Sequence, residues 1–131
     1  MKTLTLHTSP DHSQSLGELL TRLGAVAQAN GDWLLNCGSF SETVLIVVLP
    51  VANDAALTTA IGVAVAQGQR VIGVWSQGLS GDLPQSLADY GAAAVGWSEA
   101  ALRAVICGET ALWEDAGGGA RAGQFPKRNV C

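Results

Sequence analysis

The sequence has few charged and few aromatic side chains, and these shortages exclude several classes of protein. Only 14% of the 131 residues are charged and 48% are hydrophobic, so the chain is not an intrinsically disordered segment. No apolar run approaches the roughly 18 residues of a membrane span. The N-terminus, MKTLTLHTSP, has too short an apolar stretch for a signal peptide. The composition therefore predicts one cytoplasmic domain without a membrane partner.

Cysteine is also scarce, and the three cysteines form no known motif. Cys37, Cys107 and Cys131 lie far apart, without a C-x-x-C pair. This spacing predicts reduced thiols in a cytoplasmic protein. The cysteines and the two histidines, His7 and His12, do not have the spacing of metal ligands. We therefore expect neither a metal nor another cofactor.

Charge is distributed unevenly along the chain. Residues 1–115 hold four basic and all eleven acidic residues, a net charge of −7. Residues 116–131 hold three basic and no acidic residues, a net charge of +3. The acidic body argues against nucleic acid as a partner. The basic tail either docks on an acidic surface of a neighbouring subunit or is a solvated terminus, and the sequence leaves both interpretations open.

A strand, a helix and a second strand are indicated within Thr43–Gln77. Thr43–Leu49 is β-branched at five of its seven positions and uncharged, which is typical of a strand covered on both faces. Asn53 or Asp54 can N-cap the helix that follows, and Arg70–Trp75 is a second apolar strand. Such a segment forms a right-handed βαβ unit, which predicts an α/β fold.

The flanking segments extend this pattern. The other expected strands are Lys2–His7, Asp32–Cys37 and Ala92–Trp97, and the other expected helices cover about 14–29, Pro84–Asp89 and a segment capped by Ser98. Ser15 and Glu18 form a capping box, S-x-x-E, for the helix over 14–29. We therefore predict a small three-layer Rossmann-like fold of the flavodoxin type. Its five-stranded, mostly parallel sheet has the order 2-1-3-4-5.

The predicted fold covers residues 1–107, and 108–131 form a Gly-rich hinge and the basic tail. One connection is irregular, because only residues 38–42 separate the second and third expected strands. This is too short for a crossover helix. Either Asp32–Cys37 pairs antiparallel with Thr43–Leu49, or it is not a strand.

Three stretches resemble the Toll/interleukin-receptor (TIR) domain and its relative, the nucleoside deoxyribosyltransferase. Leu4–Ser9 (LTLHTS) resembles the first TIR strand and its turn, and Glu42–Leu49 (ETVLIVVL) resembles the third strand. Ala60–Trp75 (AIGVAVAQGQRVIGVW) resembles the helix and strand of the deoxyribosyltransferases. The resemblance implies a reduced TIR-like α/β domain.

Both families use a glutamate on the central helix to act at an N-glycosidic bond. Here Thr59 or Ala60 occupies that position, and Asp54 is the only acidic residue of 53–67. The resemblance therefore implies a non-catalytic binding or assembly subunit in a bacterial defence or signalling complex. The alternative is an N-glycosidase or deoxyribosyltransferase acting on NAD or a nucleoside, with Asp54 or Glu99 as its carboxylate.

Ligands of open α/β sheets bind at the carboxyl ends of the strands. The candidate ligand-binding residues at these ends are His7, Ser9, Asn53, Trp75, Ser76, Trp97 and Ser98. Tryptophan rings with nearby hydroxyls can stack a base and hold a ribose, which favours a nucleotide. The alternative is that the tryptophans cover the end of a core with few other aromatic residues.

Assembly is a second class of function that the sequence indicates. Leu57–Gly68 carries no charge, and a helix so poor in charge is often covered by a partner as well as by its own sheet. The expected partner is a second copy or another protein, bound through the helix 53–67 and the tail 117–131. The alternative is a helix that packs only within its own domain.

Overall fold

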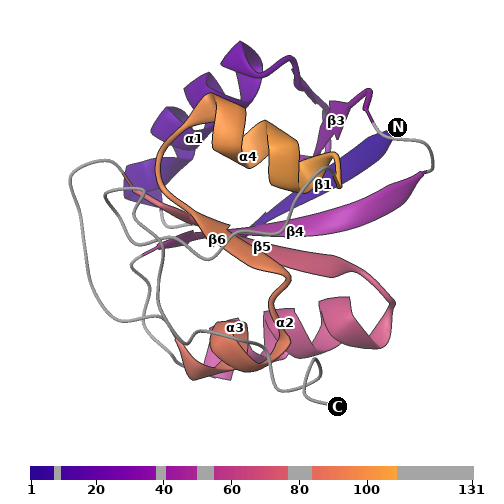
Figure 1. Ribbon diagram of the computed structural model, residues 1–131, viewed down its shortest axis with the longest axis vertical. Coiled ribbons are helices and arrows are strands. Elements are labelled where there is room, and N and C mark those ends of the chain that lie inside the picture. Colours follow the sequence, from indigo (N-terminus) through magenta and orange to yellow (C-terminus); the bar gives the residue numbers. More distant parts are fainter. Residues whose placement is uncertain (8–9, 38–40, 50–54, 77–83, 109–131) are drawn as a thin grey trace.

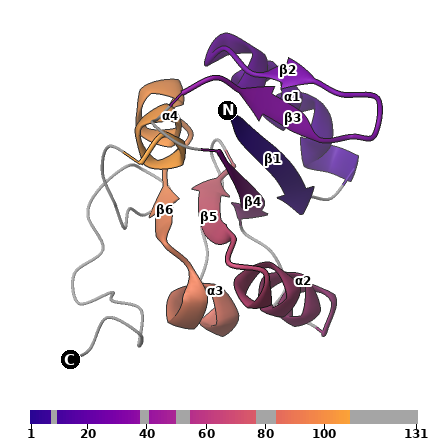
Figure 2. The same cartoon turned by 90° about the vertical axis from the view of Figure 1, so that its right-hand side faces the viewer.

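A computed structural model describes residues 1–7, 10–37, 41–49, 55–76 and 84–108. The elements in chain order are β1 (Lys2–His7), α1 (Pro10–Arg22), β2 (Val26–Ala27), β3 (Trp33–Leu35), β4 (Glu42–Leu49), α2 (Ala55–Ala66), β5 (Arg70–Trp75), α3 (Gln85–Tyr90), β6 (Ala93–Val95) and α4 (Glu99–Ile106). The sheet lies between two pairs of helices, with α1 and α4 on one face and α2 and α3 on the other (Figures 1 and 2). The α/β class is confirmed, but the sheet has six strands and not five.

The strand order is β2-β3-β1-β4-β5-β6. Strands β1, β4, β5 and β6 are parallel, and the hairpin of β2 and β3 pairs antiparallel at one edge. The five predicted strands follow the order 2-1-3-4-5, and β2 is an additional strand beyond them. The sheet is therefore mixed but mostly parallel.

The prediction for the second expected strand was wrong in its partner. It pairs antiparallel with β1, where Lys2 lies opposite Leu35, and not with β4. Lys2 lies opposite Glu42 on its other side. Since β3 ends and β4 begins at the same end of the sheet, a short connection past one strand suffices and no crossover helix is needed.

Helix α1 begins earlier and ends earlier than the sequence indicates. Its first residue is Pro10, a position that suits proline because the first N–H of a helix has no internal partner. Ser15 therefore lies inside the helix, and the prediction of a capping box was wrong. The helix ends before Gly24, whose φ of 104° is the left-handed conformation that glycine tolerates best. The residues expected to form its last turns instead form β2.

The turn between β2 and β3 is formed by Asn30 and Gly31. The N–H of Gln28 donates to the carbonyl of Asp32 at 2.8 Å, and Gly31 has a φ of 92°. The side-chain oxygen of Asn30 accepts from the N–H of Asp32 at 3.0 Å. This Asn-Gly pair was expected to end the long helix, and it instead closes a hairpin.

The central strand β4 is buried on both faces, as predicted. Alternate residues from Val44 to Val48 join the core under α1 and α4, and those from Leu45 to Leu49 join the core under α2 and α3. A strand between two helix layers needs apolar side chains on both sides, which explains its lack of alternation. The fold thus has two hydrophobic cores separated by one sheet.

The remaining helices agree with the sequence. Helix α2 ends before Gly68, which has a φ of 75°. Pro84 precedes α3, and the hydroxyl of Ser98 caps α4 by accepting from the N–H of Ala101 at 3.3 Å. The proposed caps of α2, Asn53 and Asp54, lie outside the described residues. Among the described residues, no helix is both long enough and apolar enough to cross a membrane.

Candidate functional site

The carboxyl ends of the strands do not bring the two predicted tryptophans together. Trp75 is only 1% exposed and packs in the core under α2 and α3. Trp97 is partly exposed and packs against the opposite core, under α1 and α4. The two indole rings therefore face opposite sides of the sheet and do not form one stacking surface. Ser9 and Asn53 lie outside the described residues.

Two other predicted ligand-binding residues, Ser76 and Ser98, have structural contacts. The N–H of Ser76 donates to the carbonyl of Leu49 at 2.6 Å, and Ser76 is buried. The hydroxyl of Ser98 caps α4. His7 is half-buried at the end of β1. In the described part of the chain, no three side chains of His, Cys, Asp or Glu are grouped as metal ligands would be.

Of the two candidate catalytic carboxylates, Asp54 and Glu99, only Glu99 is among the residues that the structure describes. Glu99 lies in the first turn of α4, where the helix dipole favours a negative charge. Its carboxylate lies 3.4 Å from the Nε atom of Arg22, and both side chains are 53% exposed. Glu99 thus takes part in a solvated ion pair between α4 and α1. Asp54 lies outside the described residues.

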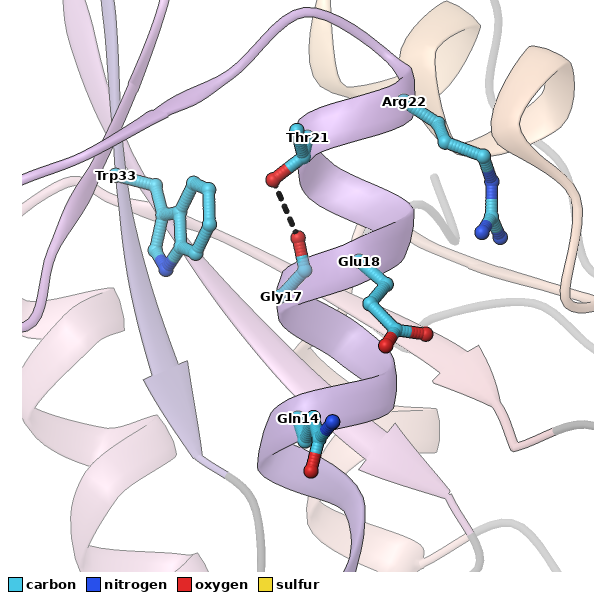
Figure 3. Close-up of a pocket in the computed structure, with 6 residues that line it drawn as sticks. All are labelled: Gln14, Gly17, Glu18, Thr21, Arg22 and Trp33. Carbon is cyan, nitrogen blue, oxygen red and sulfur yellow. Dashed lines mark hydrogen bonds between the residues drawn. The ribbon is translucent and has the colours of Figure 1, made fainter.

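An open groove of about 540 Å³ runs along α1 beside a tryptophan that was not among the predicted site residues (Figure 3). The groove is lined by Gln14, Gly17, Glu18, Thr21, Arg22 and Trp33. Five of these residues belong to α1, and Trp33 is the first residue of β3. The turn of the hairpin at Asn30 and Gly31 is what brings β3 back beside the helix.

Trp33 can lie against α1 because position 17 has no side chain. A Cβ atom at Gly17 would lie 3.4 Å from Cζ2 of Trp33 and 3.8 Å from its Cη2. The ring is half-buried and packs on the core under α1. The hydroxyl of Thr21 donates to the carbonyl of Gly17 at 2.8 Å, which turns it toward the helix backbone. The groove therefore has an aromatic wall held by the hydrophobic core.

Glu18 supplies the negative charge of the groove. Its carboxylate lies on α1 one turn before Arg22, whose own charge is paired with Glu99. The groove and its edge thus hold two carboxylates and one guanidinium. One signal for this site is visible in the sequence, the glycine at position 17 within an amphipathic helix, but the partner of that glycine was not identifiable from spacing.

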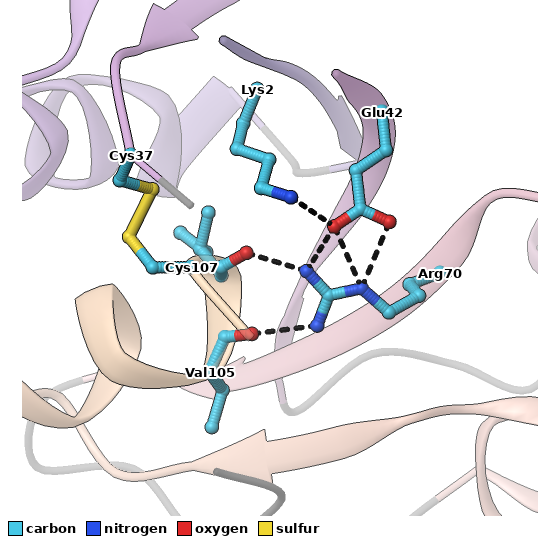
Figure 4. A network of polar contacts seen from close by, with 7 residues as sticks. Lys2, Cys37, Glu42, Arg70, Val105 and Cys107 are labelled. Carbon is cyan, nitrogen blue, oxygen red and sulfur yellow. Dashed lines mark hydrogen bonds and ion pairs between the residues drawn. A yellow bond between two sulfur atoms is a disulfide. The ribbon is translucent and has the colours of Figure 1, made fainter. Parts of the chain in front are cut away.

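A second polar cluster lies at the amino ends of the parallel strands, where β1, β4 and β5 begin (Figure 4). Lys2, Glu42 and Arg70 are the first residues of β1, β4 and β5. The Nζ atom of Lys2 lies 2.8 Å from Oε1 of Glu42, and Nη2 of Arg70 lies 2.5 Å from the same oxygen. The side chain of Lys2 is only 1% exposed. One carboxylate thus pairs with two basic side chains at the edge of the core.

Arg70 also joins this cluster to helix α4. Its Nη1 atom donates to the carbonyl of Val105 at 2.7 Å, and its Nη2 atom donates to the carbonyl of Ile106. These carbonyls lie in the last turn of α4, where helix carbonyls lack internal partners and favour a positive charge. The Arg70 side chain therefore fixes the end of α4 to the sheet.

The same interactions set the ionisation of Glu42. Burial alone raises the pKa of its carboxyl, but hydrogen bonds and charges from Arg70 and Lys2 outweigh burial and hold the pKa below its usual value. Glu42 is therefore ionised in the folded protein at neutral pH. The cluster is a structural element, and it does not line the groove.

A disulfide lies beside this cluster and corrects the prediction for the cysteines. Cys37 and Cys107 are joined across 70 residues, with their Cα atoms 5.4 Å apart. The prediction of reduced thiols was therefore wrong for these two residues. The spacing of the cysteines gave no sign of this pairing, because the fold and not the sequence brings β3 and the end of α4 together. Cys131 lies outside the described residues.

The comparisons with known proteins add no assignment. No family model, no curated protein and no solved structure matches this chain. The groove along α1 and the charges of the chain are therefore the features that bear on its function.

Proposed function

We propose that this protein is a non-catalytic binding or assembly subunit with a TIR-like α/β fold, and that it binds a basic segment in the groove between α1 and Trp33. The proposed segment is the tail, residues 117–131, of a second copy. The observation that carries the proposal is the partly exposed ring of Trp33 in an open groove that Glu18 also lines, on the other side of α1 (Figure 3).

The chemistry of the groove favours a basic ligand. An indole face attracts a guanidinium or ammonium group, and a nearby carboxylate adds an ionic contact. Tryptophan is also over-represented among the residues that dominate protein–protein binding. The groove is too open to enclose a small molecule, which favours a segment of chain over a metabolite.

The charges of the body favour the same ligand. Residues 1–115 contain four cations, Lys2, Arg22, Arg70 and Arg103. Each one is engaged within the described structure: Lys2 and Arg70 with Glu42, Arg22 with Glu99, and Arg103 with the carbonyl of Leu23 at 2.6 Å. The eleven acidic residues of the body outnumber them. The body therefore carries a net negative charge, which favours a basic partner.

The tail has the complementary composition. It contains Arg121, Lys127, Arg128 and the aromatic Phe125, and no acidic residue. The chain from Gly108 to Lys127 can reach about 60 Å when extended, which is enough to cross to a neighbouring molecule. Because each copy has one groove and one tail, two copies can exchange tails with two-fold symmetry. A tail bound to the groove of its own chain is the competing outcome.

Sedimentation velocity over a range of protein concentrations tests this proposal. We expect a monomer–dimer equilibrium in the full chain and a monomer in a chain that ends at residue 116. Glu18→Lys reverses the charge of the groove without touching the core, so it should weaken dimerisation by about tenfold, or 1.4 kcal/mol. A higher salt concentration should also lower the dimerisation affinity of the full chain, because salt screens the attraction between opposite charges.

A matched control addresses the other predicted interface. Val63 lies on α2, is 52% exposed and faces away from the core. Val63→Asp should leave the dimer unchanged if the groove is the interface. If Val63→Asp abolishes the dimer while Glu18→Lys does not, the outer face of α2 is the interface and the proposal fails. A concentration-independent monomer whose tail still contacts Trp33 would identify binding within one chain, and it would exclude assembly.

A further inference from the structure

Two independent attachments hold the C-terminal end of α4. The first is the disulfide between Cys107, the C-cap of α4, and Cys37, two residues beyond β3. The second is the pair of hydrogen bonds from Arg70 to the carbonyls of Val105 and Ile106. Figure 4 shows both anchors on the same helix end. The disulfide is covalent and can be reduced, whereas the hydrogen bonds from the Arg70 guanidinium do not respond to a reductant.

We propose that the Cys37–Cys107 disulfide is a reversible redox latch, and that reduction frees the connection after β3 from α4 while Arg70 keeps the helix in place. Both cysteines are partly exposed at the edge of the core under α1 and α4, where a dithiol in solution meets the residues that carry the bond. The disulfide joins the chain after β3 to the C-cap of α4, and each side has a second attachment: β3 pairs with β1 in the sheet, and Arg70 of β5 holds the end of α4. Opening it therefore releases a local segment and leaves the sheet intact.

The co-reactant is a dithiol reductant. Its thiolate attacks one sulfur of the disulfide, forms a mixed disulfide with that cysteine, and releases the other cysteine as a thiolate that takes up a proton. The second thiol of the reductant then closes its own disulfide and releases the first cysteine as a thiol. Two electrons and two protons pass to the protein, which gains two thiols, and the dithiol becomes a disulfide.

The disulfide is connected to both sides of the groove, Trp33 and helix α1. Cys37 lies four residues beyond Trp33 on the same stretch of chain. Helix α4 holds α1 through Glu99, which pairs with Arg22, and through Arg103, which donates to the carbonyl of Leu23. If the groove binds the tail as proposed, reduction loosens the aromatic wall and weakens that binding. This last consequence rests on the proposed function, whereas the latch itself does not.

Hydrogen exchange of the full chain in its two redox states tests the latch, with Cys131→Ser in every sample to remove the third thiol. Alkylation and mass spectrometry should find no free thiol in the oxidised protein and two after treatment with dithiothreitol. Reduction should accelerate exchange in the peptides that contain Cys37 and Cys107, and the peptides of β4 and β5 should stay protected. Removal of the reductant and reoxidation should restore the original pattern.

Arg70 variants test whether the second anchor is what preserves the fold. Arg70→Ala should remain folded when oxidised and should unfold, or lose at least about 10 °C in Tm, when reduced. Arg70→Lys keeps a positive charge toward Glu42 but cannot reach both carbonyls, so it should show a smaller loss in the same direction. The starting protein should lose only about 5 °C on reduction.

Three results would overturn the inference. Global unfolding of the reduced Cys131→Ser protein would make the disulfide a structural requirement and not a latch. Identical exchange in the two redox states would make it inert. Two alkylatable thiols under oxidising conditions would show that the bond does not form. None of these readouts uses tail binding, so a failure of the latch is distinguishable from a failure of the groove.

Discussion

The guanidinium of Arg70 lies 2.5 Å from the carboxylate of Glu42 and, through its other N–H groups, holds the last carbonyls of α4. This single residue thus joins the start of β5, the start of β4 and the end of a helix on one face of the sheet. The arrangement gives the amino ends of the parallel strands a network of charged side chains. It also determines which substitutions should be costly.

Removal of the carboxylate at position 42 should be strongly destabilising. Glu42→Ala leaves the buried ammonium of Lys2 and the guanidinium of Arg70 without their shared carboxylate, and breaking a buried ion pair in this way costs about 3 kcal/mol of unfolding free energy or more. Urea denaturation measures the change. Glu99→Ala is the matched control, because its ion pair with Arg22 is solvated and should contribute less than about 1 kcal/mol. Equal losses in the two variants would contradict this account.

The lowered pKa of Glu42 predicts an acid-sensitive fold. Because the folded-state pKa lies below the ordinary value of 4.5, this group contributes stability at pH values above the ordinary value. That stability falls as the pH drops from about 4.5 through the folded-state pKa. The midpoint of urea unfolding, followed from pH 7 down to pH 3, should therefore decrease below about pH 5.

Glu42→Gln isolates this contribution. The amide cannot titrate, so the variant should be less stable at pH 7 but should lose less additional stability between pH 5 and pH 3. Parallel pH profiles for the two proteins would show that other carboxyl groups cause the acid sensitivity.

Two glycines should respond to alanine in opposite ways. A Cβ atom at Gly73 would lie 2.8 Å from Cδ1 of Leu49 and 2.8 Å from Cδ2 of Leu87, both of which are fully buried. Gly73→Ala should therefore overpack the core under α2 and α3 and cost about 1–3 kcal/mol. A Cβ atom at Gly62 meets nothing within 4 Å on the exposed side of α2. Gly62→Ala should raise stability by about 0.5–1 kcal/mol through helix propensity, and thermal unfolding compares the two.

The enzymatic alternative makes its own prediction. A non-catalytic subunit should release no nicotinamide from NAD and no base from nucleosides during prolonged incubation, as judged by chromatography of the products. The chain lacks a glutamate at the expected position on the helix over 55–66, where Thr59 and Ala60 lie. Turnover that is lost in Asp54→Ala or Glu99→Ala would refute the non-catalytic interpretation.

Local sequence patterns predicted the central part of the fold because a single local requirement, such as burial or helix capping, determines the residue type at each position. Thr43–Leu49 is apolar because both faces of β4 are covered, and Ser98 caps α4 because an exposed helix start needs an acceptor. The α1 boundary was missed because the S-x-x-E pattern also occurs inside helices, and a positive φ at Gly24 is a consequence of how α1 packs. Short-range sequence patterns thus predict that a helix or strand exists better than they predict the residues at which it begins and ends.

The candidate site was not predictable to the same degree. Its aromatic wall depends on the contact between Gly17 and Trp33, which are brought together by a hairpin that the sequence indicated only as a helix end. The pairing of Cys37 with Cys107 spans 70 residues and depends on the same hairpin. The tryptophans at 75 and 97 were grouped because each lies at the carboxyl end of an expected strand, but side chains alternate along a strand and these two face opposite cores. Contacts between distant segments need the tertiary structure.

The most direct test of the central claim is a charge exchange between the groove and the tail, measured by sedimentation velocity on the full chain with Cys131→Ser. Glu18→Lys alone, and Lys127→Glu with Arg128→Glu, should each shift the protein toward monomer. Combining the three substitutions should restore the dimer, because the reversed charges again attract each other. A combined variant that remains as monomeric as the more severe parent, or a full chain that never dimerises, would contradict the assignment of the groove as the site that binds the tail.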